Sequence, residues 1–274
     1  MSEFRYPRIS LARYPNRITQ IMQSPLHSLL RPVSHFYIDS IPELLLQLQK
    51  VSSPKQLTKL VNKLQSRIWY LPSEEQAIAR KQLTDALIQV VEHTQQSSSR
   101  LEAAGWLRMF VQAAYVSQPE QVFVTIVTAA TQASTEANNS SPNEQHAYLK
   151  MIFDCFWPFR YPYATYTWEQ FPSNEVFYPL APLLSQGDDY TQDTLVAIFA
   201  ELPSLDDAEI GEYLLPVALD WSTHANPERR QRITTILALM SSISAQETLS
   251  RLQADPDPLV RHRAKRAAEK VRRA

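Results

Sequence analysis

Residues 257–271, with the sequence DPLVRHRAKRAAEKV, contain the clearest structural pattern in this chain. They follow a turn at residues 255–258, DPDP, which separates them from an earlier apolar pair, Leu249 and Leu252. The apolar residues after the turn recur at helical spacing, namely Val260, Ala264, Ala267, Ala268 and Val271. The end of the chain therefore predicts two helices joined by a short turn.

The same rhythm of helix, turn and helix occurs twice before this unit. From Val176 onward, apolar helical stripes alternate with turns at Gly187-Asp188-Asp189 and at Asn226-Pro227. The turn positions Asp189, Pro227 and Asp257 lie 38 and 30 residues apart. Helix pairs repeated at this spacing are typical of an α-solenoid, so we predict an all-α superhelix of stacked helical hairpins.

The last unit resembles the HEAT-like repeat, particularly the short form associated with phycobilisome bilin lyases. The resemblance lies in Asp257-Pro258-Leu259-Val260-Arg261 and in the alanines that follow, and it covers residues 245–272. In that family, Asp and Arg order the contacts between repeats. The units at 175–203 and 208–242 keep the rhythm without the Val-Arg pair, and residues 1–150 show no repeat consensus. HEAT-like proteins include scaffolds, adaptors, lyase subunits and DNA glycosylases, so the resemblance implies a fold and leaves the function open.

Three regions follow from the composition along the chain. Residues 1–37 hold five arginines and one acid, and we expect a basic extended arm there with a short helix near residues 18–22. We expect an N-terminal helical region at residues 38–135 and HEAT-like helical repeats at residues 141–274. The polar run TQASTEANNSSPN, residues 131–143, predicts the loop between these regions.

The N-terminal helical region is predicted from caps and periodicity. Helices are expected to begin near Ser40, at Ser53-Pro54 and at Ser73, where Ser73 and Gln76 fit a capping box. The helix after Ser73 should bury one apolar stripe, composed of Ala77, Ile78, Leu83, Leu87, Val90 and Val91. Residues 122–130 are rich in β-branched side chains, yet we predict a helix because no partner strand is apparent.

An acidic middle and an aromatic loop distinguish the centre of the chain. Residues 161–228 contain twelve acids and no Lys or Arg, whereas the rest of the chain has 27 basic and 16 acidic residues. Prolines interrupt the aromatic segment at residues 154–174, which we predict to be an irregular loop. Its rings fit either a small core that caps the first repeat or a contact platform for a partner.

The sequence offers no reactive constellation. The six histidines lack metal-ligand spacing, the single Cys155 fits a core position, and the paired carboxylates fall where helices begin. We therefore predict no catalytic residues, no metal and no cofactor. Enzymatic activity is left undecided, although a non-catalytic role is favoured. No signal peptide or apolar run of membrane-spanning length is present, and a cytoplasmic location is the simplest expectation.

The preferred function is a protein–protein interaction scaffold, adaptor or assembly factor. Its expected contact residues are Trp157, Tyr161, Tyr163, Tyr166, Trp168, Asp188, Asp189, Asp206, Asp207, Glu209 and Glu212. The partner would be another protein with a basic surface, or a second copy bound through its basic termini. By family resemblance, one alternative is a bilin lyase or chaperone-type subunit. A HEAT-like nucleic-acid binder or DNA glycosylase is a third, disfavoured because the acidic middle would repel phosphate.

Overall fold

The computed structural model describes residues 40–135, 142–159, 166, 171, 174–202, 205 and 208–273. These residues form α-helices and short 3-10 helices, and no β-strand occurs among them. The predicted arm at residues 1–37, with its short helix, lies outside them.

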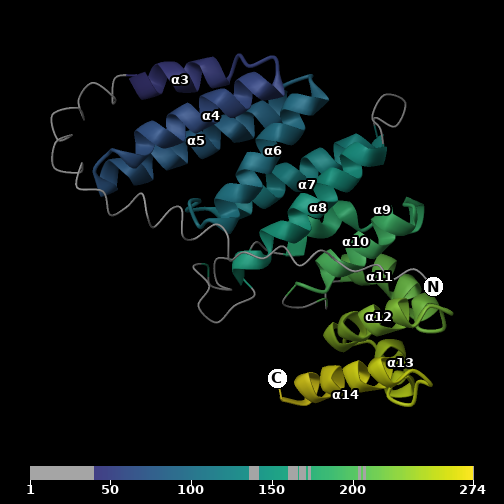
Figure 1. The fold of residues 1–274 in the computed structure, drawn as a ribbon. Coiled ribbons are helices and arrows are strands. Elements are labelled where there is room, and N and C mark those ends of the chain that lie inside the picture. Colours follow the sequence, from purple (N-terminus) through teal and green to yellow (C-terminus); the bar gives the residue numbers. More distant parts are fainter. Residues whose placement is uncertain are drawn as a thin grey trace.

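Figure 1 shows the helices following one another from α3 to α14. Contacts between the helices define two stacked layers. The first, called the A layer, consists of α3 (Ser40–Leu48), α5 (Ser73–His93), α7 (Pro119–Thr135), η6 (Asn174–Leu180) with α9 (Leu183–Gln186), α11 (Ala208–Trp221) and α13 (Ile243–Leu252). The second, called the B layer, consists of α4 (Pro54–Trp69), α6 (Ser97–Gln112), α8 (Pro142–Cys155), α10 (Asp189–Phe199), α12 (Pro227–Leu239) and α14 (Pro258–Arg273).

Each A-layer helix packs against the B-layer helix that follows it in sequence, from α3 with α4 to α13 with α14. Within the B layer every helix also packs against the next one, from α4 through to α14. This arrangement is a helical-repeat solenoid, and the all-α solenoid prediction is confirmed. The repeat also includes α3 to α7, where the sequence showed no consensus. The division into two helical regions stays a prediction, because residues 136–141 lie outside the described part and α7 packs on α8.

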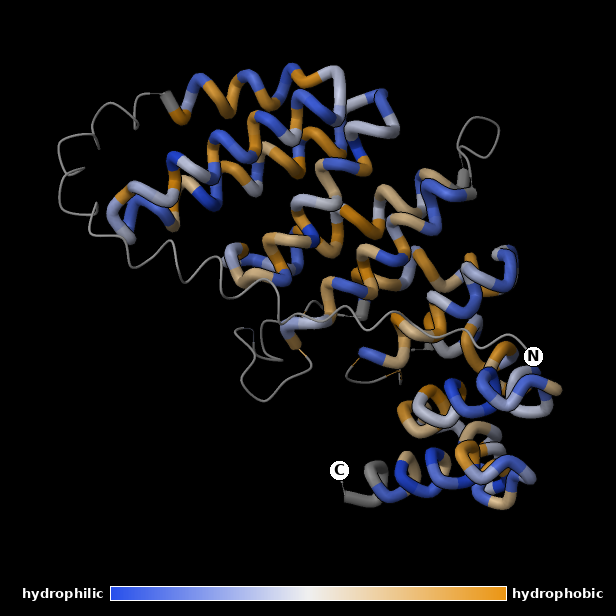
Figure 2. The backbone as a smooth tube through the Cα atoms, in the orientation of Figure 1, coloured by the Kyte–Doolittle hydropathy of each residue, from blue (hydrophilic) through white to orange (hydrophobic). Residues whose placement is uncertain are grey.

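The helix α4 shows why these segments fold as they do. The Ser53 hydroxyl accepts a hydrogen bond from the Gln56 amide, and Pro54 occupies the first turn, so both predicted start signals operate. Its buried residues are Leu57, Leu60, Val61, Leu64 and Ile68, whereas Lys55, Lys59 and Lys63 are exposed. Hydrophobic and hydrophilic residues alternate in this way along most helices (Figure 2).

The β-branched segment 122–130 is helical, as predicted. Within α7, Val122, Phe123, Ile126 and Val127 are buried against neighbouring helices, so tertiary packing outweighs their strand propensity. The helix also continues to Thr135, so the predicted loop is wrong for residues 131–135. Ala133 is buried, and the Thr131 hydroxyl donates to the Val127 carbonyl at 3.2 Å, so this polar-looking segment still has packing and hydrogen bonds.

Two details predicted for α5 are wrong. Pro72 is the N-cap residue and no side chain caps this helix. The side-chain amide of Gln76 instead donates hydrogen bonds to the carbonyls of Leu71 at 2.8 Å and Trp69 at 3.2 Å. It thus satisfies backbone carbonyls at the end of α4. Ala77 and Ile78 are exposed and Ala79 is buried, so the buried stripe begins two residues later than expected.

A cluster of aromatic rings joins α7, η6 and the residues that follow α8. The Phe123 ring lies 5.1 Å from the Phe156 ring and 5.7 Å from the Phe177 ring, measured between centroids. Phe171 lies 5.2 Å from Phe159, which belongs to η4 (Trp157–Phe159). Of the two interpretations of the aromatic segment, the small core therefore describes these rings. It fills the place where η6 and α9 replace a full-length A-layer helix.

Candidate binding surfaces

The predicted aromatic contact residues fall into three groups. Trp157 is exposed, as a contact residue should be. Tyr166 is buried, its hydroxyl donates to the Val116 carbonyl at 2.7 Å, and burial raises its pKa to about 12. Its prediction as a contact residue is corrected, because the side chain is part of the core. Tyr161, Tyr163 and Trp168 lie outside the described residues.

Asp188 caps a helix. Its carboxylate accepts a hydrogen bond from the Thr191 amide at 2.9 Å, and the His146 ring nitrogen Nε2 lies 3.2 Å from the same oxygen. The Thr191 amide holds the pKa of this carboxyl below its ordinary value, and His146 on α8 lowers it to a smaller extent. The pair also connects α8 to the start of α10.

Asp189 is paired with an arginine of the next repeat. Its Oδ1 lies 2.9 Å from Nη2 of Arg229 on α12, and the Arg229 guanidinium also lies over the Trp221 ring at 4.7 Å. Asp193, one helical turn later, lies 3.5 Å from Arg229 and 3.4 Å from Arg232. The arginines that pair with these acids, Arg229 and Arg232, thus follow immediately after the acidic middle in the sequence.

Similar ion pairs connect other neighbouring helices of the B layer. Between α6 and α8, Arg100 lies 3.3 Å from Glu144 and Arg108 lies 2.8 Å from Asp154. The predicted acidic site is therefore divided. Asp188 and Asp189 belong to this inter-repeat ladder, whereas Glu209 and Glu212 belong to α11 in the A layer. The eleven residues of α10, about 16 Å of helix, separate the two places. Asp206 and Asp207 lie outside the described residues.

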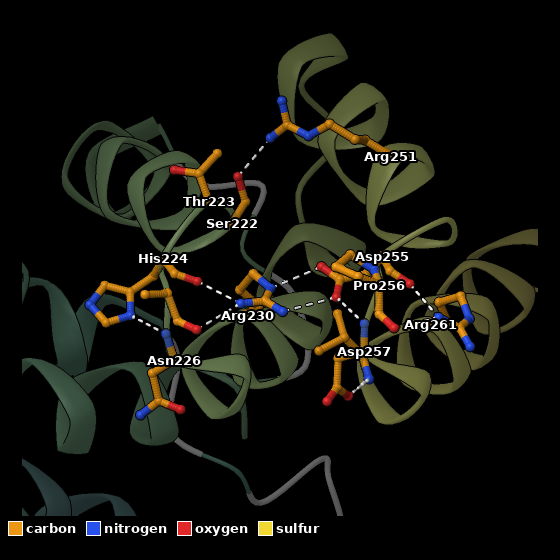
Figure 3. A network of polar contacts seen from close by, with 12 residues as sticks. Ser222, Thr223, His224, Asn226, Arg230, Arg251, Asp255, Pro256, Asp257 and Arg261 are labelled. Atoms are coloured by element: carbon orange, nitrogen blue, oxygen red, sulfur yellow. Dashed lines mark hydrogen bonds and ion pairs between the residues drawn. The ribbon is translucent and has the colours of Figure 1, made fainter.

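The turn before α14 contains a network of polar contacts (Figure 3). Asp257 and Arg261 order their own turn there, whereas the resemblance implied contacts between repeats. Asp257 caps α14 by accepting from the Leu259 amide at 2.8 Å, and Arg261 donates to the Asp255 and Pro256 carbonyls at 2.6 and 2.8 Å. One repeat earlier, Arg230 donates to the His224 and Ala225 carbonyls at 2.7 and 3.1 Å.

These two arginines are structurally equivalent. Arg230 lies four residues after the N-cap Asn226, and Arg261 lies four residues after Asp257. Each is bonded to the two carbonyls that precede its cap residue. The unit at 208–242 lacks Val before this arginine but keeps the arginine itself. The pattern Asn/Asp-Pro-x-x-Arg was the sequence signal that could have identified it.

Formal charge separates between the layers of the described helices. A-layer helices carry eleven acids and three bases: Glu43, Glu74, Glu75, Asp85, Glu92, Glu120, Glu175, Glu209, Glu212, Asp220 and Glu247 against Arg80, Lys81 and Arg251. B-layer helices carry seven acids and seventeen bases: Glu102, Glu144, Asp154, Asp189, Asp193, Glu228 and Glu269 against Lys55, Lys59, Lys63, Arg67, Arg100, Arg108, Lys150, Arg229, Arg230, Arg232, Arg261, Arg263, Lys265, Arg266, Lys270, Arg272 and Arg273. The sequence showed segregation of charge along the chain, whereas the described helices separate formal charge between the two layers.

A groove of about 890 Å³ lies on the A layer between α3, α5 and α7. Apolar side chains from all three helices line it, including Leu45, Leu46, Ile88 and Val124. Its remaining lining residues are Pro42, Gln49, Gln82, Asp85, Ala86, Gln89, Glu92, Glu120, Gln121 and Thr125. The lining thus has three acids and no Lys, Arg or His, and its volume is in the usual range for ligand sites.

Sequence reasoning missed this groove, although α3 carries a signal for it. Ile41, Leu44 and Leu48 are buried in the core, so Leu45 and Leu46 must point elsewhere on a nine-residue helix. Leu46 is 58% exposed. A short helix with apolar residues on two faces indicates a second contact surface.

The described part of the chain contains no group of three or more His, Cys, Asp or Glu side chains placed to hold a metal ion. Cys155 is fully buried, and burial raises its pKa well above the ordinary range. No described helix is long and apolar enough to cross a membrane.

No protein-family model and no curated protein matches this sequence. Among solved structures, a crystal structure of an engineered protein from the Northeast Structural Genomics Consortium is similar at a TM-score of 0.49. It shares 18% sequence identity, over 85% of this chain and 96% of that chain. A likeness at this level says nothing about function.

Proposed function

We propose that this protein is a non-catalytic scaffold of HEAT-like hairpins that binds a basic partner protein through its A layer. The observation that supports this most is the separation of charge between the layers. A surface dominated by one sign of charge attracts oppositely charged partners, speeds association and disfavours like-charged ones.

The accessible carboxylates are spread over the A layer. Glu43, Glu74, Glu120, Glu212 and Glu247 are exposed on successive helices. By contrast, several B-layer arginines are held by carboxylates of neighbouring helices, as in the pairs of Arg100, Arg108 and Arg229. The A-layer charge is thus available to a partner, whereas much of the central B-layer charge serves the fold.

Of the originally predicted contact residues, Glu209 and Glu212 fit this surface best, since both belong to α11. Asp206 and Asp207 directly precede that helix in the sequence and remain part of the proposal. Asp188 and Asp189 contribute a smaller share, because each has a partner within the chain, His146 for Asp188 and Arg229 for Asp189. Trp157, Tyr161, Tyr163 and Trp168 remain predicted contacts on the aromatic segment.

Affinity capture from the native cell extract, with mass spectrometry of the bound proteins, tests the proposal. A chain with Glu74, Glu120 and Glu212 changed to Lys should lose a basic protein that the wild type retains. The matched control changes the exposed Lys55, Lys59 and Lys63 of α4 to Glu and should retain it. Equal capture by both variants would exclude the A layer as the binding surface.

Nucleic-acid binding is a second candidate, favoured by exposed Lys and Arg side chains at both ends of the B layer. Lys55, Lys59 and Lys63 lie on α4, and Arg263, Lys265 and Arg266 lie on α14. The central helix α10 carries acids and no base, which interrupts a phosphate-binding track. A mobility shift of duplex DNA at physiological salt, lost in the α4 control variant, would support this candidate.

The bilin alternative depends on rings outside the described residues, and a shifted bilin absorption band tests it.

A further inference from the structure

We propose that the groove between α3, α5 and α7 binds an amphipathic helix of the partner, with apolar residues on one face and Lys or Arg beside them. This inference rests on the proposed function and assigns the chemical class of the segment that is recognised. The groove runs over three helices.

Each helix contributes one stripe of side chains. Along α3 and the residue that follows it, the stripe is Pro42, Leu45, Leu46 and Gln49, and on α5 it is Gln82, Asp85, Ala86 and Gln89. Both follow the spacing i, i+3, i+4 and i+7, and Gln121, Val124 and Thr125 on α7 follow its first three positions. Stripes with this periodicity are the surfaces on which helices pack, so a further helix fits the groove.

The floor of the groove is apolar and partly open to solvent. Leu46 is 58% and Val124 is 44% exposed, and Leu45 and Ile88 are partly buried. Adjacent exposed apolar groups on facing helices mark interaction surfaces more often than scattered single residues do. Covering them would remove apolar area from water and stabilise a bound helix.

The polar rim selects the charge of the occupant. Glu92 and Glu120 lie on the lining. Glu92 is 3.9 Å from His93, and Asp85 is paired with Lys81 at 2.9 Å, but neither His93 nor Lys81 belongs to the lining. Four glutamines complete the rim, namely Gln49, Gln82, Gln89 and Gln121. Amides can bond to either donors or acceptors, but the carboxylates favour a cationic segment and oppose an acidic one.

A binding experiment with synthetic peptides tests this inference on the full chain. The probe is a labelled amphipathic peptide of about 18 residues, roughly five helical turns, with Leu on one face and Lys beside it. A scrambled peptide has the same composition without an apolar face, and another has Glu in place of Lys. Fluorescence anisotropy should show the first peptide binding at least about tenfold more tightly than either control.

Two variants locate the site. Leu46→Asp together with Val124→Asp should weaken binding of the amphipathic peptide by at least about tenfold. Ile243→Asp on α13 makes the same change at an exposed apolar residue outside the groove, so it should leave affinity unchanged. Both original side chains of the double variant are exposed, and circular dichroism checks that its helices remain folded. Equal binding of the scrambled peptide, or an equal loss in the Ile243 variant, would overturn the assignment.

Other occupants give different outcomes. Replacing Arg5, Arg8, Arg13, Arg17 and Arg31 with Ser would raise peptide affinity if the chain's own N-terminal segment filled the groove. Self-association abolished by the groove variant would make the occupant a second copy. Either result overturns the proposal for a partner helix. If the groove variant still captures a partner that the Glu74, Glu120 and Glu212 variant loses, this inference fails while the proposed function stands.

Discussion

Arg230 and Asp255 form a two-point ion pair between consecutive repeats. The Arg230 Nε atom lies 2.9 Å from Oδ2 of Asp255 and its Nη2 atom lies 3.0 Å from Oδ1, and both side chains are largely buried (Figure 3). A third nitrogen of the same guanidinium is bonded to the turn before α12. One side chain thus connects the turn of its own repeat to the turn of the next.

Removal of this carboxylate should destabilise the C-terminal repeats. In Asp255→Ala, the Arg230 charge would stay buried without its partner, and such changes cost about 3 kcal/mol of unfolding free energy. Urea denaturation measures the loss, and hydrogen exchange should show it in α12 and α14. The exposed Glu247→Ala serves as the control and should change little. An unchanged unfolding midpoint in Asp255→Ala would contradict the assigned role.

Acid should loosen the same junction. Burial raises the pKa of Asp255, but Arg230 and the Asp257 amide outweigh this effect, so the pKa in the folded chain is below its ordinary value. The stabilisation is therefore complete above the unfolded pKa of about 3.9 and is lost as pH falls through the lower folded value. Thermal melts from about pH 7 to about pH 2 should show a smaller acid-dependent decrease in Asp255→Asn than in wild type. Identical pH profiles would argue against the linkage.

Tyr166 should contribute to the stability of the fold and not to partner binding. Tyr166→Phe leaves the Val116 carbonyl without its hydroxyl donor and should lower the unfolding free energy by about 1–2 kcal/mol. Partner capture by the folded variant should remain as in wild type. A variant of unchanged stability that loses the partner would restore Tyr166 as a contact residue.

Cys155 should be unreactive in the native chain. It is fully buried and its pKa is raised, so little thiolate is present to react. A thiol reagent such as DTNB should label it only at the rate of unfolding, and at once in denaturant. Rapid labelling of the folded protein would contradict its core position.

The fold was predictable from the sequence because its signals are local. Caps such as Ser53 and stripes such as Leu57 to Ile68 depend on residues within a few turns, and these positions were correct. The helical state of residues 122–130 was also predicted, although it depends on neighbours that bury Val122 and Ile126. Errors arose where two interpretations satisfied the same residues, as for Gln76, which caps the end of α4 and not the start of α5.

The binding surfaces were harder to predict because they depend on stacking. The sequence places Asp189 and Arg229 forty residues apart, yet consecutive B-layer helices bring them to 2.9 Å. An acidic run along the chain therefore does not become one acidic face. The groove was missed for the same reason, since Leu46 and Val124 lie on helices that are distant in sequence and become neighbours only in the A layer.

The central claim is that the acidic A layer binds a basic protein. Its most direct test is the affinity of the captured partner for three chains at about 50 mM and about 500 mM salt, where exposed charges are weakly and strongly screened. Wild type and the α4 control should bind tightly at low salt and lose affinity at high salt. The Glu74, Glu120 and Glu212 variant should bind at least about tenfold more weakly at low salt. Equal affinity of all three chains, unaffected by salt, would contradict it.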